Sequence, residues 1–191
     1  MSVDLRLGDC LDFPHVLCDM IITDPPFPNY YAIEYQYRDG ILDFLKDYSC
    51  RQLIFWSARV EFPLDYTAVH IWDKKTGNKT TQYDRIFERN GQKNYQIFRH
   101  YFINSTVAAQ MTGDVFTGHK SQKPIKLMAE LIEKFSKDGN VIYDPFMGSG
   151  STGVAAVRLG RGFVGREINP EYFAIAERRI AEAQAQMVMP L

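Results

Sequence analysis

A glycine-rich turn in the C-terminal third of the sequence has the residue types needed to hold a nucleotide. It reads Gly148-Ser-Gly-Ser-Thr-Gly153, which satisfies the pattern G-x-G-x-x-G, and it lies between an expected strand and an expected helix. Glycines there allow the backbone to turn tightly and to approach a ligand closely. Glu167 ends the next expected strand, where a carboxylate can accept hydrogen bonds from ribose hydroxyls. The pattern favours a nucleotide-containing cofactor over a turn that only packs a helix on a strand.

The residues just before this turn discriminate between cofactors. The strand ends in Asp144-Pro-Phe146, so a carboxylate lies at the mouth of the turn. A dinucleotide would bring its pyrophosphate close to it, and like charges in a partly buried site repel by roughly several kcal/mol. S-adenosylmethionine instead has a cationic amino-acid end and a sulfonium, and Phe146 offers an apolar face for its adenine. The segment therefore favours S-adenosylmethionine over NAD.

A second candidate site is the rigid turn Asp24-Pro25-Pro26-Phe27, which follows an apolar strand. In open α/β sheets, ligands bind at the carboxyl ends of the strands. The prolines remove two N–H donors, so the Asp24 side chain and the Pro25 carbonyl are pure acceptors. Such a pair suits a planar amino group, and Phe27 can stack on a flat ring.

The elements that must position these residues alternate along the chain, which predicts an α/β fold with a mostly parallel sheet. We expect strands over residues 3–7, 20–23, 52–56, 68–72, 95–102, 141–143 and 162–165. We expect helices over 39–48, from Pro124 to a stop at Gly139, over 153–159 with a stop at Gly160, and from Asn169, as the N-cap, past Ile180.

Composition limits the class of protein. The 191 residues are 46% hydrophobic, which suits one domain with one packed core, and the net charge is −1. Three cysteines without metal-site spacing predict reduced thiols and no metal centre. We find no apolar signal segment and no run that approaches 18 apolar residues, so we expect a soluble, cytoplasmic protein.

Four segments together resemble the amino-methylating DNA methyltransferases of the β group, in which the catalytic motif precedes the cofactor motif. They are Asp24 to Phe27, His119-Lys-Ser-Gln-Lys-Pro124, Asp144-Pro-Phe-Met-Gly-Ser-Gly150 and Gly165-Arg-Glu-Ile-Asn-Pro-Glu-Tyr172. The resemblance implies a Rossmann-like, S-adenosylmethionine-dependent fold. Its seven-stranded, mostly parallel sheet would have the order 3-2-1-4-5-7-6 with strand 7 antiparallel. Here the chain would be circularly permuted, starting at strand 3 and ending on the helix after strand 2.

The resemblance also implies roles for single residues. The catalytic turn, Asp24 to Phe27, would hold and stack a target base, most often adenine when aspartate precedes the two prolines. Phe27 stands where tyrosine is commoner, which keeps the stacking surface and loses the hydroxyl. The residues that would bind S-adenosylmethionine or shape its site are Asp9, His119, Ser121, Gln122, Lys123, Asp144, Phe146, Gly148, Ser149, Gly150 and Glu167.

The charge is unevenly distributed, which bears on DNA as a partner. Residues 73–123 carry +5 and the remainder −6. Basic side chains grip phosphates, and those we expect to contact DNA are Lys74, Lys75, Arg85, Arg89 and Arg99. We therefore expect one catalytic domain over 1–191, in which residues 73–118 are a minimal target-recognition element. Little chain remains for reading sequence, so a homodimer or a partner subunit would supply it.

The expected reaction is methyl transfer to N6 of a flipped-out adenine in DNA, as in restriction–modification systems of prokaryotic or phage-infected cells. N4 of cytosine is an alternative, because the same geometry serves both amino groups. An NAD-dependent oxidoreductase would leave the segments at Asp24 and His119 unexplained. A non-catalytic module that binds DNA or cofactor for a partner enzyme is the third alternative.

Overall fold

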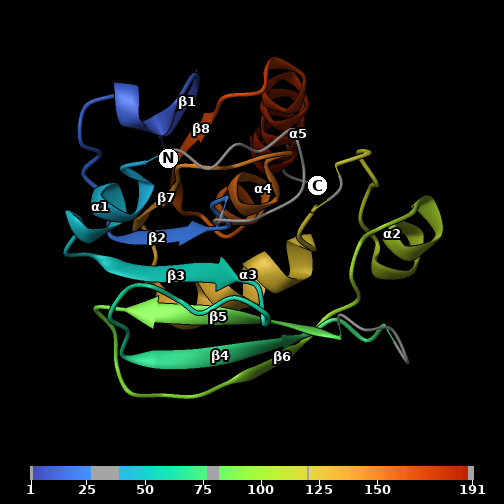
Figure 1. Cartoon of the computed structure of the whole chain (residues 1–191). Helices are drawn as coiled ribbons and strands as arrows, with labels where there is room; N and C mark the ends of the chain where they lie inside the picture. The colour runs from blue at the N-terminus through green and yellow to red at the C-terminus, as the bar shows by residue number, and fades with distance from the viewer. Residues whose placement is uncertain (1, 27–38, 77–81, 120, 189–191) are drawn as a thin grey trace.

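A single eight-stranded sheet organises the molecule (Figure 1). The computed structural model describes residues 2–26, 39–76, 82–119 and 121–188. The strands are β1 (Val3–Leu7), β2 (Met20–Thr23), β3 (Arg51–Trp56), β4 (Ala68–Asp73), β5 (Tyr83–Arg89), β6 (Ile97–Arg99), β7 (Val141–Asp144) and β8 (Gly162–Glu167). The helical segments are η1 (Cys10–Asp12), α1 (Ile41–Lys46), α2 (Thr106–Thr112), α3 (Ile125–Phe135), α4 (Ser151–Arg158) and α5 (Pro170–Val188).

The strand order across the sheet is β1-β8-β7-β2-β3-β5-β4-β6. Only β5 runs against the others among the described strands, because it pairs antiparallel with both β3 and β4. The first seven positions reproduce the expected permuted order, so the predicted fold class is confirmed. The carboxyl ends of β8, β7, β2 and β3 consequently lie in one row, and the start of β5 joins that row.

The strand prediction was wrong in the middle of the chain. The antiparallel strand is β5, over residues that we had assigned only to a basic stretch, and the strand expected over 95–102 is reduced to β6. β6 pairs parallel with β4 and adds an eighth strand at the edge of the sheet. β5 reads Tyr-Asp-Arg-Ile-Phe-Glu-Arg, whose charged residues concealed a central strand from an analysis of hydrophobic runs.

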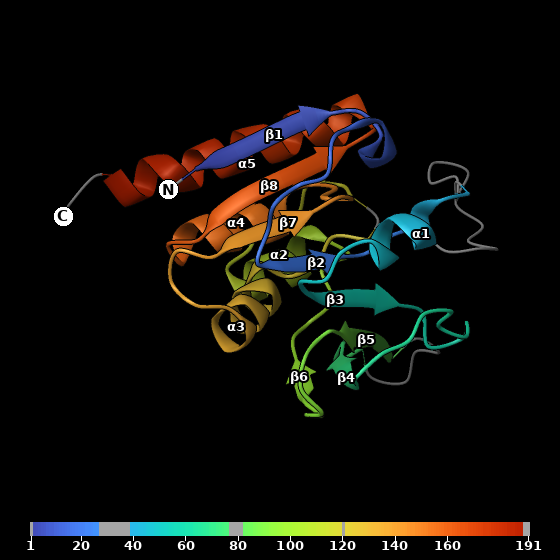
Figure 2. The ribbon, with the colours of Figure 1, turned by 90° about the vertical axis from the view of Figure 1, so that its left-hand side faces the viewer.

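Helices cover both faces of the sheet, because alternate side chains of each strand point to opposite sides. Leu53 and Phe55 of β3 belong to the large core cluster, which also includes residues of α3, α4 and α5. Ile54 and Trp56 point the other way and pack with α1. Figure 2 shows α5 and α4 along β1, β8 and β7, which they contact.

Helix boundaries differ from the prediction in several places. α1 covers Ile41–Lys46 rather than 39–48, and Pro124 is the N-cap of α3 rather than its first residue. α3 ends at Phe135 with Ser136 as its C-cap, and Gly139 lies in the following turn rather than at the helix end. α4 begins at Ser151, two residues earlier than expected. The predicted N-cap of α5 is confirmed, because Asn169 Oδ1 accepts hydrogen bonds from the backbone N–H groups of Glu171 and Tyr172, at 2.9 and 3.2 Å.

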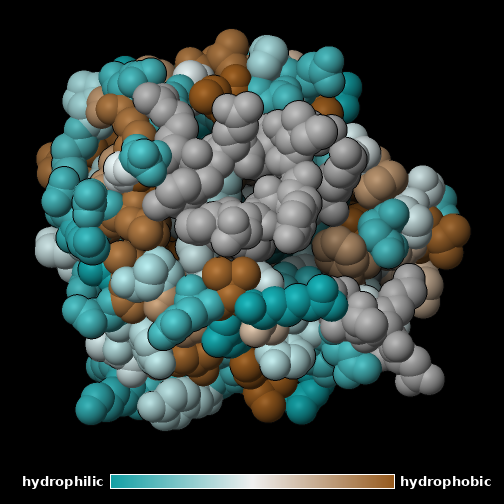
Figure 3. Space-filling model, viewed as in Figure 1, coloured by the Kyte–Doolittle hydropathy of each residue, from teal (hydrophilic) through white to brown (hydrophobic). Residues whose placement is uncertain are grey.

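The described helices include none that is long and apolar enough to cross a membrane. α2 lies apart from the sheet, and its Val107 and Met111 side chains are exposed, as the brown atoms over this helix in Figure 3 show.

Candidate active site

A cavity of about 640 Å³ runs along the carboxyl ends of the parallel strands. It brings together nearly all the residues predicted from the sequence, namely Asp9, Asp24, Pro25, Pro26, His119, Ser121, Gln122, Lys123, Asp144, Phe146, Gly148, Ser149 and Glu167. Gly150 belongs to the same turn but packs against α5, where an added Cβ would lie 2.8 Å from the Cβ of Ala176. Phe27 lies outside the described residues.

The glycine turn is shaped by close contacts that only glycine permits. Gly148 has φ +52°, and a Cβ there would lie 2.9 Å from His119 Nε2. The backbone N–H of Gly148 donates to Glu167 Oε2 at 2.9 Å, while Oε1 of the same carboxylate accepts from Asn169 N at 2.8 Å. Burial raises the pKa of Glu167, and these two hydrogen bonds oppose the rise. Glu167 thus fixes the turn and also lines the cavity.

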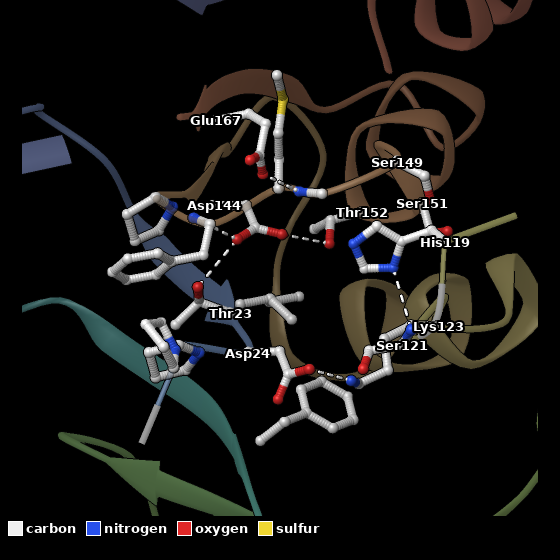
Figure 4. Close-up of a pocket in the computed structure, with 18 of the residues that line it drawn as sticks. Thr23, Asp24, His119, Ser121, Lys123, Asp144, Ser149, Ser151, Thr152 and Glu167 are labelled. Carbon is white, nitrogen blue, oxygen red and sulfur yellow. Dashed lines mark hydrogen bonds and ion pairs between the residues drawn. The ribbon is translucent and has the colours of Figure 1, made fainter. Parts of the chain in front are cut away.

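Asp144 is buried at the end of β7 and is held by two hydroxyl groups. Thr23 Oγ1 donates to Oδ1 at 2.9 Å and Thr152 Oγ1 donates to Oδ2 at 2.7 Å (Figure 4). Burial raises the pKa of Asp144 to about 6, and the hydrogen bonds oppose this rise. Thr23 and Thr152 were not predicted from the sequence as site residues. Their position next to the two motifs was the only signal, because hydroxyl residues are common beside turns.

Asp24, at the end of β2, forms an ion pair with Lys123 (Figure 4). Burial raises the pKa of Asp24, and the ammonium of Lys123 opposes the rise. The Lys123 Nζ also lies 5.0 Å from the centroid of the Phe55 ring. The sequence analysis placed Lys123 among the residues that would bind S-adenosylmethionine or shape its site. In the structure its ammonium pairs with the carboxylate of the candidate catalytic turn.

The His119 segment forms a second wall of the cavity. Its ring accepts a hydrogen bond at Nδ1 from Ser121 N, at 3.2 Å, and lies edge-on to Tyr172 with 4.3 Å between ring centroids. Gln122 Nε2 donates to the carbonyl of Val115 at 2.7 Å, which anchors the turn to the preceding segment of the chain. On the opposite side, Asp9 Oδ1 accepts from Leu11 N at 2.9 Å and caps η1.

A buried arginine that the sequence analysis missed supports the glycine turn from α5. Arg179 Nη1 donates to the carbonyl of Ser149 at 2.6 Å, and its Nη2 pairs with Asp114 at 3.2 Å. Asp114 in turn accepts from Ile125 N, at the start of α3, at 3.0 Å. The pair thus connects the turn, α5 and α3.

Three of the five predicted DNA-contacting residues turn their side chains inward. Lys74 is 9% exposed and lines the cavity, and its Nζ lies 2.7 Å from Asp84 Oδ2. The Arg85 guanidinium donates to the carbonyls of Ser57 and Val60.

Arg89, the third of them, donates to the carbonyls of Asp65 and Leu45, at 3.0 and 2.9 Å. Lys75 and Arg99 lie at the surface. The five residues therefore do not form one basic stripe, because three of them serve the fold or the cavity.

Comparison with known proteins identifies the family. The model of the N6_N4_Mtase family, described as DNA methylase, matches residues 31–178. The chain belongs to this family. S-adenosylmethionine is the methyl donor of these DNA methylases, so the expectation of this cofactor rather than NAD is confirmed at the level of the family.

The curated relatives of this chain are longer proteins. The type II methyltransferase M2.DpnII of Streptococcus pneumoniae is 38% identical over 105 residues, which are 47% of this chain and 39% of that protein. M2.LlaDCHI of Lactococcus lactis subsp. cremoris is 31% identical over 121 residues, 60% of this chain and 42% of that protein. The chain thus spans about two fifths of the length of these relatives.

Several solved structures share the fold of this chain. M1.HpyAVI in complex with SAM is 23% identical with a TM-score of 0.65, over 94% of this chain and 99% of that chain. A putative DNA modification methylase of Thermus thermophilus, solved with S-adenosyl-L-methionine, is 22% identical with a TM-score of 0.58, over 96% of each chain. The PvuII DNA methyltransferase (cytosine-N4-specific) is 16% identical with a TM-score of 0.67, over 98% and 93% of the two chains.

Proposed function

We propose that this domain transfers a methyl group from S-adenosylmethionine to the exocyclic amino group of a DNA base, with N6 of adenine as the target. One observation carries the proposal. Asp24 and Asp144 end neighbouring parallel strands in one cavity, and Thr23, next to Asp24, donates directly to Asp144. The Asp24 acceptor of the Asp-Pro-Pro turn and the Asp144 carboxylate beside the glycine turn are thereby fixed relative to each other.

The residues on the Asp144 side fit S-adenosylmethionine. A Cβ at Gly148 would lie 2.9 Å from His119 Nε2, so only glycine lets the turn and the His119 ring line the cavity side by side. Asp144 and Glu167 supply carboxylates for cationic and hydroxyl groups, and Phe146 supplies an apolar surface. The cavity of about 640 Å³ is within the usual range for such ligands, roughly 300–1,000 Å³. Gly148, Ser149, Asp144, Phe146 and Glu167 would hold the cofactor.

When bound, this cofactor supplies a methyl group on a positively charged sulfur. Asp24 and the carbonyl of Pro25 accept hydrogen bonds from the amino group of the base and so orient its nitrogen. Orientation of two bound reactants can supply much of the rate, roughly 7–11 kcal/mol of a barrier in favourable cases. The Asp24 carboxylate also stabilises the positive charge that develops on the amino nitrogen. Lys123 holds that carboxylate in place.

Adenine is favoured over cytosine because aspartate precedes the two prolines, and this form of the motif leans towards adenine in the family. A solved structure of similar fold acts on N4 of cytosine, according to its description, and shares only 16% identity. The same pair of acceptors serves both amino groups. N4 of cytosine is therefore the second candidate target.

The test combines a binding and a product measurement. The purified chain is titrated with S-adenosylmethionine in a calorimeter, then incubated with unmethylated plasmid DNA, which is digested to nucleosides for mass spectrometry. We expect N6-methyladenine from the wild type, and none from Asp24→Ala at unchanged cofactor affinity. Asp43→Ala, which removes an exposed carboxylate on α1, is the matched control and should behave as the wild type. Full activity of Asp24→Ala would refute the assignment.

A further inference from the structure

The cavity continues beyond Asp24, over the ends of β3, β5 and β4, and there it contains a second ion pair. Lys74 Nζ lies 2.7 Å from Asp84 Oδ2, and both residues line the cavity. The Lys74 side chain is 11% exposed and that of Asp84 is 24% exposed. This pair is separate from the glycine turn and from Asp144, because β2 and β3 lie between β7 and the strands that carry it.

The sheet holds both residues rigidly. Asp84 is the second residue of β5 and pairs in register with Trp72 of β4. Lys74 directly follows β4; its N–H donates to the carbonyl of Gln82 at 2.8 Å, and its own carbonyl accepts from Phe102 N at 3.2 Å. The backbone is fixed on both sides, and the ion pair with Asp84 gives the ammonium a defined position in the wall of the cavity.

Stability does not explain a charged pair in this place. The Lys74 ammonium lies 5.2 Å from the ring centroids of both Trp72 and Phe102, so it is held in a largely aromatic part of the cavity wall. Burying two charges costs desolvation energy that their attraction often fails to recover. A rigid, partly desolvated donor beside aromatic rings is the kind of group that reads a planar ligand.

The pair belongs to the same electrostatic unit as the candidate catalytic turn. Asp24 with Lys123 and Asp84 with Lys74 form two pairs of opposite charge in one cavity. Asp84 acts to raise the pKa of Asp24, and Lys74 acts to lower it. A ligand whose amino group reaches Asp24 therefore has its neighbouring atoms in the field of Lys74.

We propose that Lys74, oriented by Asp84, donates a hydrogen bond to the ring nitrogen beside the amino group of the target base. That atom is N1 of adenine or N3 of cytosine, and both are acceptors. The corresponding positions of guanine and thymine carry a hydrogen and would face the ammonium donor unpaired. Lys74 is thus a specificity-determining residue that selects adenine and cytosine as a class, and Asp84 is its positioning residue. This inference rests on the proposed function, since it needs a base in the cavity.

The test removes each partner of the hydrogen bond in turn. Single-turnover methylation is measured for the wild type and Lys74→Met on a duplex that the wild type modifies, and on the same duplex with 1-deazaadenine at the target. 1-Deazaadenine replaces the ring nitrogen by C–H; 3-deazacytosine serves if the product is N4-methylcytosine. A duplex with 7-deazaadenine, which keeps N1, is the substrate control. Lys137→Met, at an exposed site before β7 and at the far end of the sheet, is the protein control.

We expect the two losses of rate to be non-additive: removing both Lys74 and the ring nitrogen should cost no more than removing either one. Loss of a hydrogen bond to a charged donor should lower the rate about 10- to 100-fold, whether Lys74 or the ring nitrogen is removed. Lys74→Met should lose no further rate on 1-deazaadenine, while Lys74→Arg and the 7-deazaadenine duplex should retain most of the activity. Asp84→Asn should lower the rate on adenine and leave the rate on 1-deazaadenine nearly unchanged. Cofactor affinity should stay within about twofold of the wild type throughout.

Two results would overturn this inference and leave the proposed function intact. One is equal loss for Lys74→Met on adenine and on 1-deazaadenine; the other is full wild-type activity on 1-deazaadenine, which needs no variant to fold. A wild-type chain that transfers no methyl group to any duplex would instead refute the proposed function, and the inference with it.

Discussion

Thr23 donates its hydroxyl to the carboxylate of Asp144 at 2.9 Å, across 121 positions of the sequence. The bond joins the carboxyl ends of β2 and β7, which are neighbours in the sheet. Asp24 follows Thr23 directly, so the bond sets the separation between the candidate base-binding carboxylate and the candidate cofactor-binding carboxylate. Proximity of two reactants depends on such fixed distances.

Asp144→Asn should stabilise the unliganded chain at neutral pH. The pKa of Asp144 is raised by burial from 3.8 to about 6, which corresponds to about 3 kcal/mol. Well below pH 3.8 the group is protonated in both the folded and the unfolded state. As the pH rises from 4 to 6 the unfolded chain ionises first, so the free energy of unfolding falls by this amount and stays low above pH 6.

Urea denaturation between pH 4.5 and 7.5 checks this expectation. The decline should be present in the wild type and absent in Asp144→Asn, which should be more stable by about 1–3 kcal/mol at pH 7.5. The exposed control Asp43→Asn should follow the wild type. The same Asp144 variant should bind S-adenosylmethionine more weakly, because it lacks the negative charge. An identical pH dependence in all three proteins would contradict the prediction.

Lys123→Met should change the pH dependence of methyl transfer rather than the affinity for the cofactor. The ammonium of Lys123 lowers the pKa of Asp24, so its removal should raise that pKa further. Because the ionised carboxylate is the better acceptor, the acidic limb of the rate profile should move to higher pH. Lys123→Arg should restore much of the wild-type profile. A tenfold weaker cofactor affinity with an unmoved limb would instead favour a role at the cofactor carboxylate.

Gly148→Ala should weaken cofactor binding for a reason that Gly160→Ala does not share. Both glycines have positive φ, +52° and +76°, so each substitution costs about 1 kcal/mol of backbone strain. Only at Gly148 would the new Cβ meet a neighbour, His119 Nε2 at 2.9 Å. Thermal melting should therefore fall for both variants, whereas calorimetric affinity for S-adenosylmethionine should fall for Gly148→Ala alone. Equal affinities would show that the turn tolerates a side chain.

Arg179→Met should destabilise the fold by about 3–5 kcal/mol, since it leaves Asp114 as an unpaired buried charge. The adjacent Arg178 is its matched control, because its side chain is 70% exposed and its pair with Glu182 spans 4.0 Å. Arg178→Met should cost less than about 0.5 kcal/mol. Urea midpoints of the two variants give the comparison. Similar midpoints would mean that the Arg179–Asp114 pair contributes nothing to stability.

Short motifs of adjacent residues allowed the site and the order of the sheet to be predicted from the sequence. The glycine turn, Asp144 before it and the Asp24-Pro-Pro turn each combine a strand end with residue types that serve few other purposes. Because parallel strands bring their carboxyl ends to one edge, these motifs predicted a common site before any contact was known. The order of the motifs also predicted the permuted order of the sheet, which the structure confirms.

Partners from distant parts of the chain remained hidden until the tertiary structure was known. β5 is a central strand although four of its seven residues are charged, because other segments satisfy those charges. Glu88, for example, pairs with His70 at 2.9 Å and with Arg51 at 3.1 Å. A search of the sequence for apolar runs cannot detect such ion pairs.

The same limit applies to the cavity. The sequence by itself determined which cofactor chemistry the site favours, through residues that are adjacent along the chain. Only the tertiary structure decided that Lys123 pairs with Asp24, that Thr23 and Thr152 hold Asp144, and that Lys74 turns inward to Asp84. The physical reason is that the residue type is the same whether a lysine lies in a phosphate-binding loop or in a base-binding cavity. The strands packed around it determine which of the two it lines.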